Sequence, residues 1–361
     1  MDKANAGETI EIVVNQTPFY AESGGQVGDT GTLTTGEGLV VEVTDTYKRA
    51  ADLFVHRGKI DSGSIVVGQN IQMEIDHLRR QQIRRHHSAT HLLHEALRRV
   101  LGDLVAQKGS LPDETRTRCD SAHGDPRTPE PHARINEIVN HHIRENSPVS
   151  TKVMSVDEAM ESGARALFGE KYGEQVRVVA MGQDPNEKGA YSIELCGGTH
   201  VNHTGEIGAF QIISEGGVSA GVRRVEAVCG LEADKVIEQR QEILRDLSET
   251  LKSSPEELKD RITDLLQERK DLEKELSEMR KKLATGAPAD EHEEVNGIKF
   301  VGKVMEGIPP KELRPMADAL KQKVGSGVVV LVATNDGKGS IVVGVTDDLT
   351  AKVSAVDLVR T

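Results

Sequence analysis

Two short motifs constrain the fold of this chain more than any other feature: His87-Ser-Ala-Thr-His91 and Cys196-Gly-Gly-Thr-His200. Residues four apart on a helix lie on one face, so His87 and His91 project together. Cys196 and His200 add a thiolate and a third imidazole, and four such ligands suit Zn²⁺. The sequence therefore predicts one bound Zn²⁺ per chain. To bind it, two segments that lie far apart along the chain must meet in the fold.

The local context of each motif supports this prediction. Between residues 83 and 97, apolar and histidine residues recur with the spacing of a single helical face. The strand-like run 191–195 leads into Cys196, and the two glycines that follow allow a tight turn. His94 is expected to be packed or to support the ligands. For the first motif alone, the simpler alternative is a solvated helix face.

The charge of the chain limits the partners it can have. The net charge is −13, which disfavours indiscriminate binding to nucleic acid. A local exception is the predicted helix at residues 77–101, which carries six arginines, including Arg84 and Arg85, against a single glutamate. This segment is either a basic surface beside the metal or an ordinary exposed helix face.

The location of the chain is predicted from its cysteines and apolar runs. Cys119, Cys196 and Cys229 are odd in number and widely spaced, which fits a reducing compartment and no disulfide framework. No apolar run approaches the roughly 20 residues of a membrane span, and the first ten residues do not resemble a signal peptide. We expect a cytoplasmic protein with no membrane partner.

The pattern of strands, helices and turns predicts an α+β fold in four parts. Residues 1–75 form short strand-like runs between glycine-rich turns and indicate a small β-barrel-like unit. Residues 76–230 mix helices and strands as a two-layer α+β domain. Residues 231–284 carry leucine seams typical of a helical hairpin or coiled coil. Residues 285–361 begin a small α/β domain that stops within a helix.

The glycine-rich segment at residues 19–29 is the second candidate functional feature. Its sequence is Phe-Tyr-Ala-Glu-Ser-Gly-Gly-Gln-Val-Gly-Asp, and it contains Gly24, Gly25 and Gln26. Glycines let a backbone approach a ligand closely, so this loop is predicted to bind substrate. The alternative is a plain hairpin turn.

Taken together, these motifs resemble the editing half of bacterial alanyl-tRNA synthetase. The resemblance covers nearly the whole chain, and threonyl-tRNA synthetase shares only the pairing of HxxxH with CxxxH. The motifs that carry it are residues 19–29, the histidine motif at 87–94, Gln-Lys-Gly-Ser at 107–110, Leu-Phe-Gly-Glu-Lys-Tyr-Gly at 167–173, the cysteine motif at 196–200, and the run at 214–228.

The resemblance implies hydrolysis of the ester that joins serine or glycine to the end of tRNA specific for alanine. An alanine pocket cannot strongly reject glycine or wholly exclude serine, so a second site is needed. Thr90 is the first candidate for contacting the serine hydroxyl and Gln107 the second, with Cys196 in the catalytic set. Thr90 could instead bond back to a helix carbonyl. Arg223 and Arg224 are predicted to meet tRNA phosphates, unless they form strand-end ion pairs.

Several alternatives stay open at this stage. The family's aminoacylation domain is not found in the chain, so we expect either a fragment of the ligase or a stand-alone editing protein of the long type. Ligase activity by this chain alone is not expected. A third alternative is a non-catalytic tRNA-binding module with a structural zinc. Self-association is predicted through the helical region or the C-terminal domain.

Overall fold

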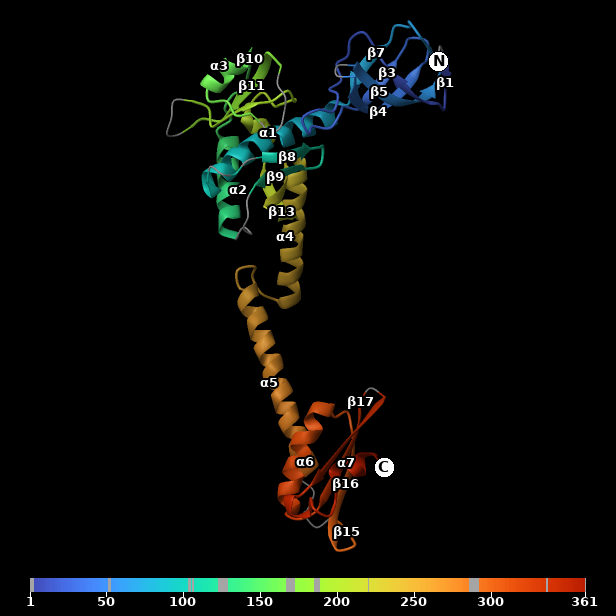
Figure 1. Cartoon of the computed structure of the whole chain (residues 1–361), viewed down its shortest axis with the longest axis vertical. Coiled ribbons are helices and arrows are strands. Elements are labelled where there is room, and N and C mark those ends of the chain that lie inside the picture. The colour runs from blue at the N-terminus through green and yellow to red at the C-terminus, as the bar shows by residue number, and fades with distance from the viewer. Residues whose placement is uncertain are drawn as a thin grey trace. The chain divides into compact units, whose positions relative to one another are not determined.

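The computed structural model describes residues 3–50, 53–102, 105, 107–122, 129–166, 173–184, 189–219, 221–285, 292–335 and 337–360. The chain divides into two compact units, Met1–Glu242 and Ile243–Thr361 (Figure 1). Residues 167–172 of one family motif lie outside the described residues, as do residues 185–188 of the loop that the sequence predicts at 184–189. The mixed α+β class predicted from the sequence is confirmed. The four-part division stays a prediction.

The first unit begins with an antiparallel sheet in the order β2-β5-β4-β3-β7. Along β4, Val41 and Val43 are buried while Glu42 between them is exposed, which is the alternation of a half-buried strand. Among the described residues the outer strands β2 and β7 are not paired with each other, so this barrel-like sheet stays open. Its strands are β2 (Thr9–Ile12), β3 (Gly31–Thr34), β4 (Val40–Arg49), β5 (Leu53–Ser62) and β7 (Gln72–Ile75), beside the short pair β1 (Lys3–Asn5) and β6 (Ser64–Val66).

The long helix α1 (His77–Leu101) connects this sheet to the next layer. It begins at Asp76, whose carboxylate accepts a hydrogen bond from the Arg79 amide at 2.9 Å and satisfies one of the unpaired amides of the first turn. Leu92 and Leu93 of α1 are fully buried in the main core together with Ile135 of α2 (Pro129–Arg144).

Under these two helices lies a second antiparallel sheet, in the order β13-β14-β9-β8. Helices on one side and a sheet on the other make the predicted two-layer arrangement. The strands are β8 (Gln107–Pro112), β9 (Thr117–Ala122), β13 (Phe210–Ser219) and β14 (Val222–Cys229).

A third, three-stranded antiparallel sheet in the order β10-β11-β12 positions the cysteine motif. Its elements are β10 (Ser150–Ser155), α3 (Val156–Glu161), β11 (Gln175–Met181) and β12 (Ser192–Leu195), followed by the short helix η1 (Thr204–Ile207). The sequence pattern predicts a helix from residue 157 to 167, but α3 ends at Glu161. Gly163 has a φ of +80°, which a continuing helix does not allow, and Arg165 pairs instead with Glu194.

The second unit contains a four-stranded sheet in the order β15-β16-β17-β18, and the helices α6 and α7 pack on it. Only β16 and β17 are parallel, as their connection through α6 requires. Leu313 and Met316 of α6 pack on Val329 and Leu331 of β17. The strands are β15 (Glu293–Val295), β16 (Ile298–Glu306), β17 (Val328–Asn335) and β18 (Lys338–Val345), and the helices are α6 (Pro310–Val324), η2 (Asp347–Leu349) and α7 (Ala355–Arg360).

Two further helices run through the predicted linker: α4 (Leu231–Leu251) and α5 (Leu258–Thr285). The sequence predicts a helix restart at the Ser-Pro-Glu-Glu box of residues 254–257, but these residues form a turn and α5 begins at Leu258. No helix in the described ranges is long and apolar enough to cross a bilayer.

Gly25 holds the glycine-rich loop against β8, and its replacement by alanine is expected to lower stability. Its φ is +83°, and a Cβ atom there would lie 2.1 Å from the carbonyl oxygen of Ser110. The backbone conformation alone costs a non-glycine residue about 1–2 kcal/mol. The urea midpoint of Gly25→Ala should therefore fall. Gly36→Ala is the matched control, because nothing lies within 4 Å of a Cβ there. Equal midpoints for the two variants would contradict the packing described.

Candidate metal centre and pocket

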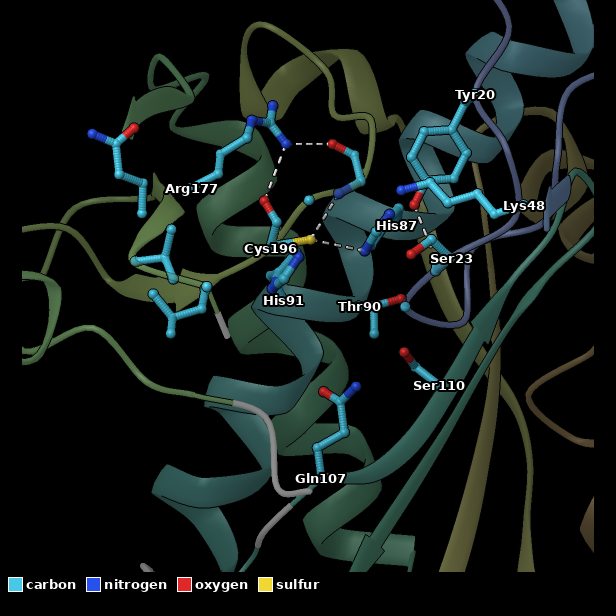
Figure 2. A pocket seen from close by; sticks show the side chains of 17 residues that line it. Tyr20, Ser23, Lys48, His87, Thr90, His91, Gln107, Ser110, Arg177 and Cys196 are labelled. Atoms are coloured by element: carbon cyan, nitrogen blue, oxygen red, sulfur yellow. Dashed lines mark hydrogen bonds between the residues drawn. The ribbon is translucent and has the colours of Figure 1, made fainter. Parts of the chain in front are cut away.

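Four side chains from three segments converge on one point in the first unit. His87 and His91 come from α1, Cys196 directly follows β12, and His200 precedes η1. The Cys196 sulfur lies 3.3 Å from the Nε2 atoms of both His87 and His200. One ligand atom from each of the four residues lies within 4.8 Å of the others. The structure thus brings together all four residues that the two motifs predict as metal ligands. Figure 2 shows His87, His91 and Cys196 of this cluster.

Each imidazole of the cluster is oriented by a partner on its outer nitrogen. The Nδ1 of His87 is 2.7 Å from Gln26 Oε1, and the Nδ1 of His200 is 3.2 Å from Ser88 Oγ. The Nδ1 of His91 donates to the Glu194 carboxylate. With a metal ion bound, such bonds would fix the tautomer whose Nε2 is unprotonated and turned to the centre, as in metal sites generally.

Glu194 supports two histidines at once. Its second carboxylate oxygen lies 2.7 Å from the Nδ1 of His94. His94 therefore supports the cluster from outside, as the sequence suggested. Glu194 is 2% exposed. Burial would raise the pKa of Glu194, but the imidazoles of His91 and His94 outweigh it and hold that pKa at about 2. The carboxylate is therefore ionised and acts as a fixed acceptor.

The protonation of the cluster also suits a metal ion. Burial opposes ionisation of Cys196, yet the imidazoles of His87 and His91 keep the pKa of its thiol well below the usual range. Burial, assisted by the charge of His87, lowers the pKa of His200 to about 3. A thiolate and a neutral imidazole are the forms that bind metals.

The donor set fits Zn²⁺. Bonds of about 2.3 Å to sulfur and 2.0–2.1 Å to nitrogen place tetrahedral ligand atoms about 3.5 Å apart, close to the two sulfur–nitrogen distances of 3.3 Å. The Nε2 of His91 is buried and has no hydrogen-bond partner among the described residues. A buried polar atom without a partner is costly, and a shared cation would satisfy it.

The loop that carries Cys196 and His200 is shaped by a glycine and an arginine. A Cβ atom on Gly198 would lie 2.1 Å from His87 Cε1, so only glycine allows the two segments to approach this closely. Arg177 of β11 donates hydrogen bonds to the carbonyl oxygens of Cys196, at 3.1 Å, and Gly198. Figure 2 shows these two bonds beside the cluster.

Gln26 links the glycine-rich loop to this centre. It is fully buried, and its Oε1 accepts hydrogen bonds from His87 and from the Thr199 amide at 2.8 Å. Its Nε2 donates to the Thr199 hydroxyl at 3.0 Å. Gln26 was predicted to contact substrate, whereas in the structure its side chain contacts a cluster residue and the cysteine loop. Of the two glycines predicted with it, Gly24 lines the adjoining pocket and Gly25 packs on β8.

A cavity of about 670 Å³ opens beside the cluster (Figure 2). Small-molecule sites usually measure 300–1,000 Å³, so this one has room for a nucleoside ester. Strands of the second and third sheets, β8 and β11, and the glycine-rich loop contribute to the wall of this cavity. The lining residues that carry polar or charged side chains are Tyr20, Ser23, Lys48, His87, Thr90, His91, Gln107, Ser110, Gln175, Arg177 and Cys196.

The two predicted hydroxyl-contacting residues both line this cavity. The Thr90 hydroxyl donates to the His86 carbonyl at 2.7 Å, which is the back-bonding alternative. It also lies 2.6 Å from the Thr117 hydroxyl, which then acts as donor. One lone pair of Thr90 is left to accept a hydrogen bond. Gln107 is 7% exposed, at the start of β8.

The arginines predicted to meet phosphate are mostly engaged within the protein. Arg223 pairs with Glu215, and Arg224 lies 2.7 Å from Asp120, which is the ion-pair alternative. Arg85 donates to the carbonyl of Glu206 at 2.9 Å. Arg84 differs, because its Nε is buried without a partner among the residues described.

Sequence reasoning missed several residues of the site. Ser88, Glu194 and Arg177 contact the cluster or its loop, and Tyr20 and Lys48 line the cavity. Glu194 lies two residues before Cys196 at the end of a strand, so strand alternation turns its side chain to the same side as that of Cys196. That signal was available. Tyr20 and Ser88 lie inside the predicted motifs at residues 19–29 and 87–91, whereas no sequence pattern marked Arg177 or Lys48.

Comparisons with known proteins agree with this geometry. The family model described as the threonyl and alanyl tRNA synthetase second additional domain matches residues 176–226, which include Cys196 and His200. The model described as tRNA synthetases class II (A) matches residues 1–79. The first unit thus contains the additional domain that threonyl- and alanyl-tRNA synthetases share.

Whole-chain similarity selects the alanyl branch. The alanine–tRNA ligase of Chelativorans sp. is 52% identical over 369 residues, covering 100% of this chain and 42% of the relative. The alanine–tRNA ligase of Gluconobacter oxydans is 51% identical, over 99% of this chain and 41% of the relative. This chain is similar over its whole length to alanyl-tRNA synthetases, and it spans about two fifths of the length of the curated relatives it matches.

Replacing Gln26 by leucine is expected to weaken metal binding. The change removes the acceptor that fixes the His87 tautomer, and losing such a partner typically costs 10–100-fold in metal affinity. Competition with a chromophoric chelator would measure this. Gln69→Leu serves as control, because Gln69 makes only an exposed hydrogen bond to the Val66 amide within the same unit. Unchanged affinity in Gln26→Leu would mean that Gln26 does not position His87.

Proposed function

We propose that this chain hydrolyses the ester that joins serine or glycine to tRNA specific for alanine. It uses Zn²⁺ held by His87, His91, Cys196 and His200. The observation that supports it most is the position of the cluster. His87, His91 and Cys196 form part of the wall of a cavity large enough for a terminal adenosine ester. Zn²⁺ bound to these side chains would therefore lie at the edge of that cavity.

The chemistry needed is attack of water on the ester carbon. Four protein ligands close a tetrahedral site, so bound Zn²⁺ would act as a Lewis acid or activate water by taking a fifth ligand, or would hold the terminal ribose and the substrate amine in position. The protein's own residues do the rest of the positioning. Glu194 and Gln26 hold the imidazoles, Arg177 fixes the cysteine loop, and Lys48 supplies a cation at the cavity for the terminal phosphate.

Selectivity against alanine follows from an unpaired polar group. The remaining lone pair of Thr90 accepts a hydrogen bond from a serine hydroxyl, with Gln107 as the neighbouring amide. Alanine has no hydroxyl, so in its complex these groups lose their water without gaining a partner. Correctly charged tRNA is therefore spared.

The proposal also covers the arginines that contact tRNA, the location of the protein and its self-association. Arg84, Arg85, Arg223 and Arg224 lie on the tRNA side, with Arg84 the member whose Nε has no partner among the described residues. We assign the protein to a reducing cytoplasm, and the three cysteines without disulfide bonds support this assignment. Leu272, Leu276 and Met279 of α5 are about half exposed and form the seam for self-association.

A deacylation assay tests the function. The chain should release serine and glycine from tRNA specific for alanine and leave alanyl-tRNA intact. Cys196→Ala should abolish this activity and lower bound zinc, because it removes one ligand and the thiolate that the imidazoles stabilise. Cys119→Ala, at a buried cysteine away from the cluster, is the control. Zinc retained with no deacylation by the native chain would favour the alternative of a non-catalytic tRNA-binding module.

Thr90→Val tests the contact to the serine hydroxyl while keeping the shape of the side chain. Loss of one neutral hydrogen bond costs about 1 kcal/mol, so kcat/KM for seryl-tRNA should fall roughly five- to tenfold. The value for glycyl-tRNA should not change, since glycine has no hydroxyl. A fall of the same size for both substrates would show that Thr90 only supports the helix. Thr115→Val, on the exposed turn before β9, is the matched control.

A further inference from the structure

A second group of metal-binding side chains lies at the C-terminal end of α2, apart from the cluster described above. It consists of His141, His142 and Glu145, one ligand atom of each lying within 4.8 Å of the others. The Glu145 carboxylate lies 3.2 Å from His141 Nε2 and 2.8 Å from His142 Nδ1. Three ligands bonded at 2.0–2.2 Å to one tetrahedral ion would lie about 3.3 Å apart. The distance from His141 is close to that value and the distance from His142 is shorter, and each runs to a different oxygen of Glu145.

Two of the three side chains are held in place by neighbours. The His142 ring stacks on Tyr191, with centroids 3.7 Å apart and planes at 28°. Its side chain is 4% exposed. The Glu145 carboxylate also accepts a weak hydrogen bond from the Gln183 amide at 3.4 Å. His141 is 60% exposed and leaves one side of the group open to solvent and to water ligands.

The position in the helix favours a cation. Carbonyl groups of the last turn give a helix C-terminus a partial negative charge, which attracts positive charge. The carboxylate adds a full negative charge next to two imidazoles. Imidazole nitrogen with one carboxylate is a ligand set for transition metals and not for Mg²⁺ or Ca²⁺.

We propose that His141, His142 and Glu145 form a second site, for a divalent transition-metal ion such as Zn²⁺ or Co²⁺, with water completing its coordination. A bound ion takes the place of the protons that these imidazoles share with Glu145. It would brace the end of α2 beside Tyr191, the residue that precedes β12. The site is independent of the proposed hydrolysis.

The experiment measures bound zinc by equilibrium dialysis at fixed free Zn²⁺, with elemental analysis, on full-length protein that carries no histidine tag. The native chain should bind two ions, and His141→Ala and Cys196→Ala one each. The double variant should bind none. In His141→Ala and Glu145→Gln the affinity of the second site should fall at least about tenfold, the lower end of what even an outer partner contributes.

His203→Ala is the matched control, because His203 is 51% exposed and faces Glu206 at 3.7 Å without a third ligand. Its zinc content should equal that of the native chain. The proposal is overturned if His141→Ala and Glu145→Gln bind as much zinc as the native chain, or if His203→Ala loses as much as they do. If the first cluster binds no zinc, the native chain should bind one ion and His141→Ala none, so the two failures are distinguishable.

Discussion

The hydrogen bonds of Gln26 are the interaction on which the functional region depends. One buried carboxamide joins the glycine-rich loop, the helix that carries His87 and the loop that carries Cys196 and His200. Its partners lie 61 and 173 residues further along the chain. A buried amide is stable only when its donors and acceptors are satisfied, so the three segments must take one relative position. The N-terminal sheet therefore belongs to the centre structurally, although it contributes no ligand.

Many charged side chains are likewise paired within the fold. The arginines of α1 look like a basic surface in the sequence, yet Arg80 pairs with buried Asp29, and Arg98 and Arg99 pair with buried Glu95. The Arg80–Asp29 pair connects α1 to the glycine-rich loop, whereas the two pairs with Glu95 lie within α1. All three pairs leave less charge for a nucleic acid. In a chain of net charge −13, the cations at the cavity itself, Lys48 and Arg177, gain importance for any anionic substrate.

The two histidine clusters differ in what surrounds them. In the first, every outer imidazole nitrogen has a dedicated partner and the inner atoms are buried, so the ligands are held before any ion arrives. In the second, one histidine is fixed by Tyr191 and another is exposed. The first arrangement suits a tightly held ion and the second a weaker, exchangeable one. Each cluster contacts a residue in or next to β12: Glu194 in the first cluster and Tyr191 in the second.

Sequence alone determined the α+β class, the stripe of α1 and the four ligands that converge, because helix periodicity and motif spacing are local properties. From the sequence, Thr90 could either contact the serine hydroxyl or bond back to a helix carbonyl. Only the tertiary structure showed the hydroxyl bonded to His86, the arginines engaged by Glu215 and Asp120, and the end of α3 at Glu161. The arginine pairs and the end of α3 depend on which groups of other strands lie within about 3 Å. Spacing along a chain cannot give that distance, because it is fixed by the packing of segments far apart in the sequence.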